Sequence, residues 1–185
     1  MNKLIITVLA KDRPGIIAQV TTDLFELDCN LENVNQMILQ EEFAGFFIVE
    51  APEGLTPESV QEDLTKRNNG NGLTIHVHAL DTETSSPFDS TGGEIFLITT
   101  IGPDQKGLVA RFSSIIASFN ANIVNLKAVF KGGKDPNDNV MSYQVAVTPE
   151  IDTAGLFAAL RQKADELELD IRIQHKNIFD AINKI

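Results

Sequence analysis

The 185-residue sequence predicts an α+β fold made of two similar domains, each with the element order βαββαβ. Three observations lead to this prediction. A shift of 92 positions aligns the two halves of the sequence without a gap from residue 4 to residue 35. Each half alternates apolar runs of strand length with segments of helical periodicity. A polar stretch rich in Ser, Thr, Gly and Pro, residues 81–93, separates the halves and is typical of a linker.

The match between the halves includes positions that packing alone does not fix. Apolar residues at helical spacing recur in any two amphipathic helices, whereas a matched acid, glycine and pair of asparagines do not. The matched pairs are Asp12 with Asp104, Gly15 with Gly107, Asn30 with Asn122, and Asn33 with Asn125. We interpret the sequence as a tandem duplication, with domains at residues 1–80 and 94–175 and a helical tail at residues 176–185.

Local patterns define the elements of the first half. A strand rich in β-branched residues ends at Leu9, and apolar residues at helical spacing begin at Ile16. Thr56 and Pro57 are typical of the N-cap and first position of a second helix, which "NNGNG" ends. In order, the expected elements are strand Leu4–Leu9, helix Ile16–Leu27, strands Val34–Gln40 and Phe43–Glu50, helix Leu55–Arg67 and strand Leu73–Leu80.

The second half repeats this order. Its hairpin between the second and third strands is longer, "KGGKDPNDN", and is either a tolerated surface insertion or a functional loop. After the last strand, Ile178, Ile182 and Ile185 share one helical face, which either packs on the sheet or docks a partner. The expected elements are strand Ile95–Ile101, helix Leu108–Phe119, strands Val124–Lys131 and Met141–Val147, helix Thr153–Leu167 and strand Asp170–Gln174.

This ferredoxin-like order forms a four-stranded antiparallel sheet with two helices on one face, because both crossovers are right-handed. The first and third strands are apolar on both faces, which places them at the centre of the sheet. A sheet covered on one face only would alternate apolar and polar residues. We therefore expect a second domain or a second subunit to cover the other face or extend the sheet, and we expect a homo-oligomer, most simply a dimer.

Composition and charge argue against several classes of function. The net charge is −11 and no run of Lys or Arg is present, which argues against direct contact with nucleic acid. A single cysteine, Cys29, rules out an intramolecular disulfide, and no apolar run approaches the roughly 20 residues of a membrane span. The start of the sequence lacks the cleavage pattern of a signal peptide. We expect a cytoplasmic protein that does not enter a membrane.

The motif "DRPG" at residues 12–15 lies at the corner between the first strand and the first helix. The N-terminus of a helix offers unpaired backbone N–H groups that bind an anion, and a glycine lets a ligand approach the backbone. The carboxylate of Asp12 would accept hydrogen bonds from an ammonium group. Together these groups outline a site for an α-amino acid, which the amides of Asn30 and Asn33 could complete. The alternative is that Asp12 caps the helix and Gly15 only relieves crowding.

The arrangement of a strand, "DRPGII", a helix, "NLEN" and a second strand resembles the ACT domain, a small-molecule sensing module. Two such domains in a chain of this length resemble the tandem ACT proteins of the glycine cleavage system transcriptional repressor family. Effectors of ACT domains, usually amino acids, bind between the loop after the first strand and a neighbouring domain. The resemblance implies the ligand contacts Asp12, Arg13, Gly15, Ile16, Asn30 and Asn33 in the first half, and Asp104, Gln105, Lys106, Gly107, Leu108, Asn122 and Asn125 in the second.

The resemblance further implies a non-enzymatic regulatory protein with a small amino acid as effector, no cofactor, and a protein partner such as a transcription regulator. The second corner departs from the first, because Gln105 and Lys106 replace Arg13 and Pro14. The two corners therefore need not bind the same ligand.

Other functions stay open on the residues alone. The fold also suits a structural oligomerisation module without a ligand, and "GPDQKGLVAR" has some likeness to the phosphoryl-binding loop of acylphosphatase-like enzymes. His76 and His78 share one face of a strand, but no further metal ligand accompanies them. We therefore expect solvated or interface histidines there and no metal site.

Overall fold

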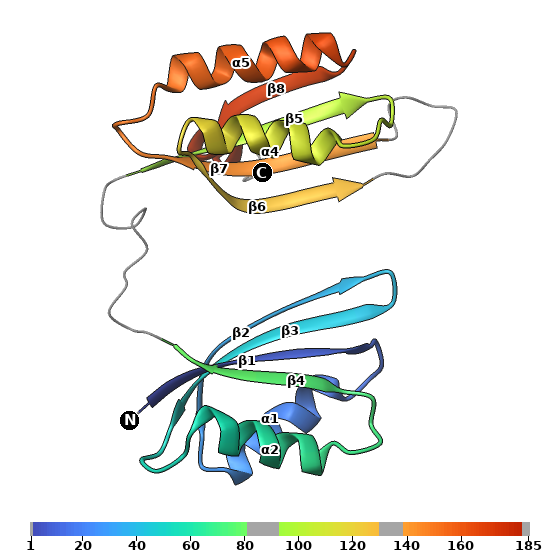
Figure 1. Cartoon of the computed structure of the whole chain (residues 1–185), viewed down its shortest axis with the longest axis vertical. Coiled ribbons are helices and arrows are strands. Elements are labelled where there is room, and N and C mark those ends of the chain that lie inside the picture. The colour runs from blue at the N-terminus through green and yellow to red at the C-terminus, as the bar shows by residue number, and fades with distance from the viewer. Residues whose placement is uncertain (1, 81–92, 130–138, 183–185) are drawn as a thin grey trace. The chain divides into compact units, whose positions relative to one another are not determined.

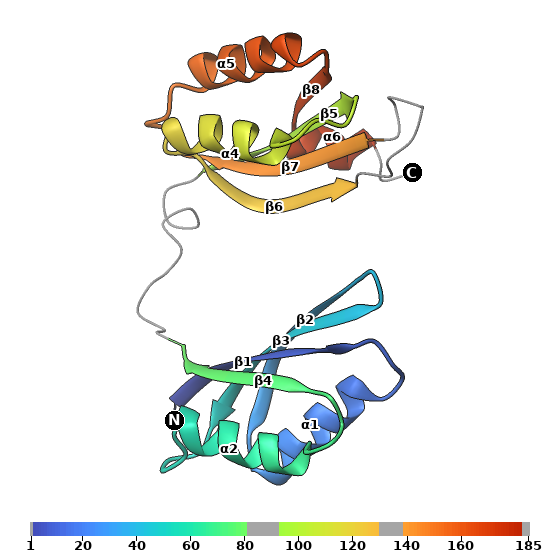
Figure 2. The same cartoon turned by 45° about the vertical axis from the view of Figure 1, so that its right-hand side comes forward.

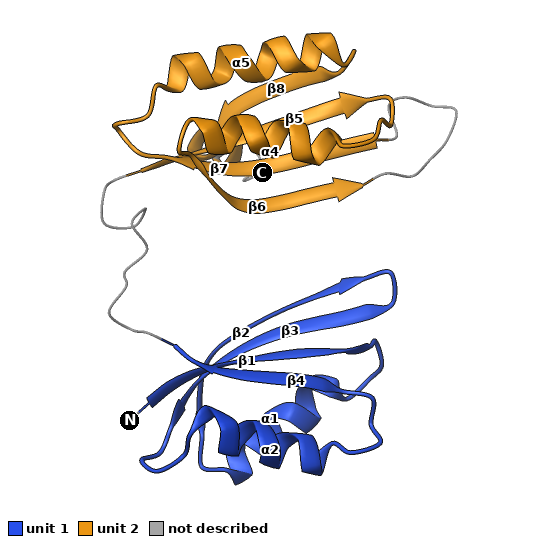
Figure 3. Cartoon of the chain, in the orientation of Figure 1, with its two compact units in different colours: residues 1–84 blue, residues 85–185 orange. Residues whose placement is uncertain are grey.

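The computed structural model of the chain describes residues 2–80, 93–129 and 139–182. It divides into two compact units, Met1–Thr84 and Ser85–Ile185, which Figure 3 shows in blue and orange. The expected linker lies outside the described residues except for Gly93, and so do Ile185 and all but Asn139 of the expected long hairpin loop.

The first unit has the predicted order βαββαβ (Figure 1). Its strands form one antiparallel sheet in the order β2-β3-β1-β4, so the first and third strands are central as expected. Both helices lie on one face of that sheet. The elements are β1 Asn2–Lys11, α1 Ile16–Glu26, β2 Asn30–Leu39, β3 Glu42–Ala51, α2 Pro57–Arg67 and β4 Thr74–Ala79.

The second unit repeats this topology, with the strand order β6-β7-β5-β8, and the predicted fold class is confirmed. Its elements are β5 Glu94–Gly102, α4 Leu108–Ser118, β6 Asn122–Val129, β7 Asn139–Val147, α5 Thr153–Glu166, β8 Asp170–His175 and α6 Lys176–Ile182. The tail helix α6 contacts β5 and β8 (Figure 2). The helix thus lies next to the sheet, but Ile178 of the predicted apolar face is 58% exposed, so the predicted packing of that face on the sheet stays a prediction.

Side-chain alternation along the central strands sets the core of the first unit. Leu4, Ile6 and Val8 of β1 are completely buried in the core that the sheet forms with its helices. The intervening side chains point to the other face, where Leu9 and Phe46 are each 46% exposed. All ten residues of the edge strand β2 are exposed. The central strands are thus apolar on both faces, as the sequence indicates. The face of the sheet away from the helices is open and carries apolar side chains in this unit.

The helix ends follow two different rules. Thr56 caps α2 as predicted, because its hydroxyl accepts a hydrogen bond from the backbone N–H of Ser59 while the Ser59 hydroxyl accepts one from the N–H of Thr56. By contrast, α1 begins after Gly15 with no side-chain cap. Within the described ranges, no helix combines the length and the apolar character that crossing a membrane requires.

Candidate ligand-binding corner

The corner between β1 and α1 turns on Gly15. This residue is the N-cap of α1 and has φ 94° and ψ −4°, a left-handed conformation that glycine adopts without a steric penalty. Pro14 precedes this cap and lies in the turn. No side chain caps α1, which excludes the alternative in which Asp12 serves as the helix cap.

Asp12 is held through its backbone. Its N–H donates a hydrogen bond to the carbonyl of Glu41 at 2.7 Å, which fixes the corner to the hairpin between β2 and β3. Gln40 and Glu41 turn that hairpin with φ values of 48° and 69°. The side chain of Asp12 is exposed, and among the described residues its carboxylate has no hydrogen-bond or ion-pair partner. The carboxylate is thus available to a ligand.

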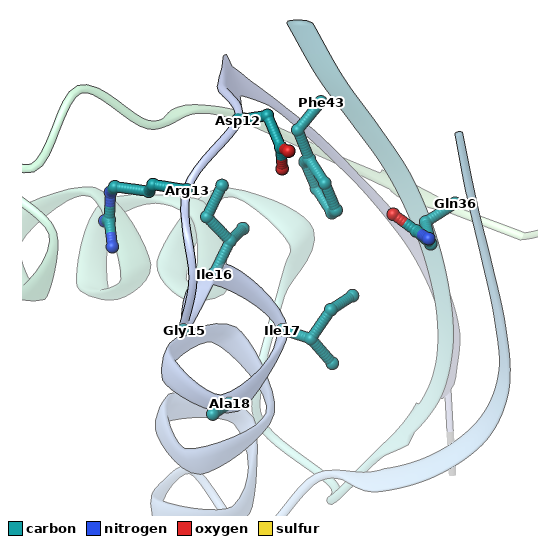
Figure 4. Close-up of a pocket in the computed structure, with 8 residues that line it drawn as sticks. All are labelled: Asp12, Arg13, Gly15, Ile16, Ile17, Ala18, Gln36 and Phe43. Carbon is teal, nitrogen blue, oxygen red and sulfur yellow. The ribbon is translucent and has the colours of Figure 1, made fainter. Parts of the chain in front are cut away.

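A pocket of about 460 Å³ opens at this corner (Figure 4). Its volume is in the range of small-molecule sites. The Asp12 carboxylate and the Gln36 amide point into it from opposite sides of the Phe43 ring. The lining residues come from the corner, the first turn of α1, β2 and β3: Asp12, Arg13, Gly15, Ile16, Ile17, Ala18, Gln36 and Phe43.

The first turn of α1 presents backbone N–H groups at the pocket. The first hydrogen bond of the helix runs from the N–H of Gln19 to the carbonyl of Gly15 at 2.9 Å. The N–H groups before it, those of Ile16, Ile17 and Ala18, have no partner within the helix. The side chain of Ile16 is 2% exposed and packs in the core, so Ile16 can offer a ligand only its backbone.

Arg13 faces away from the other lining side chains (Figure 4). Its guanidinium donates hydrogen bonds to the Gln19 side chain at 3.1 Å and to the carbonyl of Asn71 at 3.5 Å. Asn71 belongs to the connection between α2 and β4. The structure therefore gives the Arg13 side chain a structural role, and only its backbone borders the pocket side of the corner.

The second corner has the same backbone but different anchoring. Gly107 is the N-cap of α4 with φ 80°, again without a side-chain cap. Gln105 aligns with Arg13, and its side-chain amide donates a hydrogen bond to the carbonyl of Leu167 at 2.7 Å, at the end of α5. This position thus ties the corner to the connection that follows the second helix in the first unit and to the C-cap of the second helix in the second unit. Leu108 is 3% exposed and packs in the core, whereas Asp104 and Lys106 are exposed.

Within one unit, the asparagines do not lie at the corner. Asn30 pairs with Glu50, whose other neighbour is Lys3 at the start of β1, while the corner follows Lys11 at its end. The separation is about 25 Å at a rise of about 3.3 Å per residue. In the second unit, Asn122 opens β6 in the same way and lines a separate pocket of about 370 Å³. The amides of a unit therefore cannot complete the site at that unit's own corner.

The asparagine pair instead marks a β-bulge. The register of β2 against β3 shifts between Leu31 and Asn33, and β6 shifts at the matching place before Asn125. The bulged residue, Glu32, forms an ion pair with Lys3 at 2.8 Å, and this hydrogen bond raises the pKa of the Lys3 ammonium. The spacing of the asparagines that the two halves share thus reflects an equivalent bulge in both units.

The histidines stand apart from the corner. His76 and His78 are exposed on the edge strand β4, opposite Thr7 and Ile5 of β1. In the part of the chain that the structure describes, no group of three or more His, Cys, Asp or Glu side chains could hold a metal ion.

Four pocket residues were not predicted from the sequence: Ile17, Ala18, Gln36 and Phe43. The two helical residues follow directly from the helix N-terminus. Gln36 had its own signal, because it interrupts the apolar row Val34 and Ile38 on the helix-facing side of β2. Phe43 required knowledge of the pairing that sets it opposite Ala10, next to the corner.

Two βαββαβ units with the same glycine-capped corner define a class of tandem ferredoxin-like domains. The chain belongs to the ACT domain family, whose model matches residues 2–78 and 94–174. The tandem architecture predicted from the repeat is therefore confirmed.

Individual relatives match one unit or the whole chain. A UPF0237 protein of Methanosarcina acetivorans is 29% identical over 90 residues, which cover 49% of this chain and 95% of the relative. An unknown protein from Galdieria sulphuraria has a crystal structure that matches with a TM-score of 0.75 and 21% identity, over 94% of this chain and 98% of the other. The crystal structure of a protein described as a glycine cleavage system transcriptional repressor matches with a TM-score of 0.69 and 15% identity, over 94% and 96%. At these identities the two structures show the shared fold alone.

Proposed function

We propose that this chain is a non-enzymatic regulatory protein that binds a small α-amino acid at the corner of its first ACT domain and thereby alters its contacts with a protein partner. One observation carries the proposal: an unpartnered carboxylate and the free N–H groups of a helix N-terminus border the same pocket. Membership of the ACT family supports the regulatory part of the proposal.

The chemistry of the pocket suits both ends of an amino acid. The ligand's carboxylate would accept hydrogen bonds from the N–H groups of Ile17 and Ala18, where the helix dipole favours negative charge. Its ammonium group would donate to the Asp12 carboxylate, a charge-assisted hydrogen bond. Micromolar affinity requires about 8 kcal/mol, which five to ten heavy atoms can provide.

A second ACT domain would complete the site. β2 is an edge strand that runs parallel to β1, so the asparagines at its start lie far from the corner at the end of β1. If the edge of another ACT domain paired with β2 in antiparallel fashion, its strand would run in the opposite direction. The asparagines of that second domain, contributed by a second copy of the chain, would then lie toward the end of β2 that carries Gln36.

A structural oligomerisation module is the second candidate. Its support is the exposed edge strand β2, which carries Met37, Ile38 and Leu39 with exposed fractions of 58%, 55% and 67%. Exposed apolar residues on an edge strand favour association with another strand. Such a module would oligomerise without binding an amino acid, which separates it from the first proposal.

Thermal denaturation with each of the twenty amino acids distinguishes the two functions. A ligand present at 100 times its dissociation constant stabilises the protein by about 2.7 kcal/mol. We expect at least one amino acid to stabilise the protein, and we expect Asp12→Ala to lose this stabilisation. The same measurement on Asp104→Ala shows whether the second corner also binds the amino acid. The absence of stabilisation by any amino acid would favour the oligomerisation module.

A further inference from the structure

Gln36 is an exposed polar residue in an otherwise apolar row of β2. It lies on the helix-facing side of β2, opposite Gly45 of β3, in a row whose neighbours Val34 and Ile38 are apolar. An apolar side chain at this position would continue the amphipathic pattern. Among the described residues, no hydrogen bond of the Gln36 amide is found, although the side chain lines the corner pocket. The exposed amide borders the pocket and is free to bond a ligand there.

The surrounding wall confines what Gln36 can contact. Figure 4 shows its amide directed from β2 toward Phe43 and Ile17, on the far side of the pocket from the corner loop. The groups for the ammonium and the carboxylate of an amino acid lie at the other side, at Asp12 and the start of α1. A ligand held there by its charged groups would extend its side chain between the apolar wall and the Gln36 amide.

The position of the Phe43 ring depends on Gly45. A Cβ atom at residue 45 would lie 2.8 Å from the Phe43 ring, closer than such contacts occur. The ring therefore lies over the glycine, on the helix-facing side of β3. In the second unit Met141 takes the place of Gly45, because it pairs with β6 where Gly45 pairs with β2. Met141 is 2% exposed and fills the core.

The second corner lacks this arrangement. Ala128 aligns with Gln36 and pairs with Met141, and Asn139 pairs with Gly102 where Phe43 pairs with Ala10. An alanine methyl group cannot form hydrogen bonds with a ligand. The two corners thus share the backbone for a charged ligand end but differ at the place of its side chain.

Resting on the proposed function, we propose that Gln36 determines which amino acid the first corner accepts, and that it selects ligands whose uncharged side chain carries a hydroxyl or carboxamide group. A neutral amide both donates and accepts hydrogen bonds, which such side chains match. It offers no charge to balance an acidic or basic side chain. The second corner does not make this selection, because Ala128 stands in the place of the amide.

Calorimetric titration with two isosteric ligand pairs tests this inference. The ligands are threonine against valine and asparagine against leucine, each added to the full chain, to Gln36→Met and to Asn35→Ala. Met preserves the length of Gln and removes its hydrogen bonds. Asn35 is the matched control, because it carries an amide on the same strand with its side chain on the opposite face of the sheet.

We expect the full chain to bind the polar member of a pair about five- to tenfold more tightly, since one or two neutral hydrogen bonds distinguish the members. In Gln36→Met the two members of a pair should bind with equal affinity. In Asn35→Ala the preference for the polar member should be unchanged. An unchanged ratio in Gln36→Met, or equal binding of both members by the full chain, would overturn the inference while leaving amino-acid binding intact. If no amino acid binds to any variant, the proposed function itself fails.

Discussion

Replacing Gly15 by alanine tests whether the corner depends on a left-handed residue at the start of α1. Gly15 has φ 94°, and a Cβ atom there would meet no heavy atom within 4 Å. The substitution therefore adds backbone strain without a steric clash. Left-handed conformation costs a residue with a side chain about 1–2 kcal/mol, and the loss of unfolded-state freedom offsets about 0.4–1 kcal/mol of that. The net destabilisation should be about 1 kcal/mol.

Differential scanning calorimetry measures this effect. For a domain of this size, about 1 kcal/mol lowers the melting temperature by about 4–8 °C. Gly15→Asn should lose less, because asparagine tolerates the left-handed region better than alanine does. Gly107→Ala is the matched variant in the second unit, with φ 80° and an equally open surrounding, and should show a similar loss. If Gly15→Ala were neutral, or if Asn were as costly as Ala, the conformational reasoning would be refuted.

Three further substitutions separate binding from stability. Arg13→Ala should weaken amino-acid binding less than twofold by calorimetry, because the Arg13 guanidinium bonds to Gln19 and Asn71. Asp12→Ala should abolish binding. A large loss of affinity in Arg13→Ala would show that this side chain contacts the ligand. Gly45→Ala should destabilise the first unit in urea by about 1–3 kcal/mol, because its Cβ would displace the Phe43 ring, and a neutral result would show that the ring moves freely. Burial raises the pKa of Tyr143 to about 12, which favours the neutral phenol in the folded state. The unfolded state loses the phenol proton above pH about 10, whereas the folded state keeps it until pH about 12. The free energy of unfolding should therefore fall by about 2 kcal/mol between these pH values, relative to that of Tyr143→Phe. If the free energies of unfolding of the two proteins, measured in urea, changed equally from pH 9 to pH 12, this prediction would be wrong.

The sequence predicted the fold well because the duplication doubled each signal. The apolar residues on both faces of β1 and β3 placed these strands at the centre, and Thr56 marked the start of α2 correctly. The strand β2 was predicted to begin at Val34 but begins at Asn30, because a bulge breaks its alternation near Asn33. A bulge removes the period on which strand prediction relies.

The site was predicted less completely, for a topological reason. Residues near the corner in sequence, such as Asp12 and Gly15, were found because the helix start is a local feature. Gln36 and Phe43 reach the pocket only through the pairing of β2, β3 and β1, which is not encoded in a short motif. The family resemblance assigned Arg13 to the ligand, yet its side chain bonds to Asn71 across the unit.

Backbone amide spectra recorded by NMR during titration test the central claim most directly. The titrant is the amino acid that gives the largest thermal stabilisation. We predict that the largest chemical-shift changes occur at the backbone amides of Ile17 and Ala18 and at the side-chain amide of Gln36. These chemical-shift changes should be absent in Asp12→Ala. Saturable changes confined to residues outside this pocket, or no saturable changes with any of the twenty amino acids, would contradict the account.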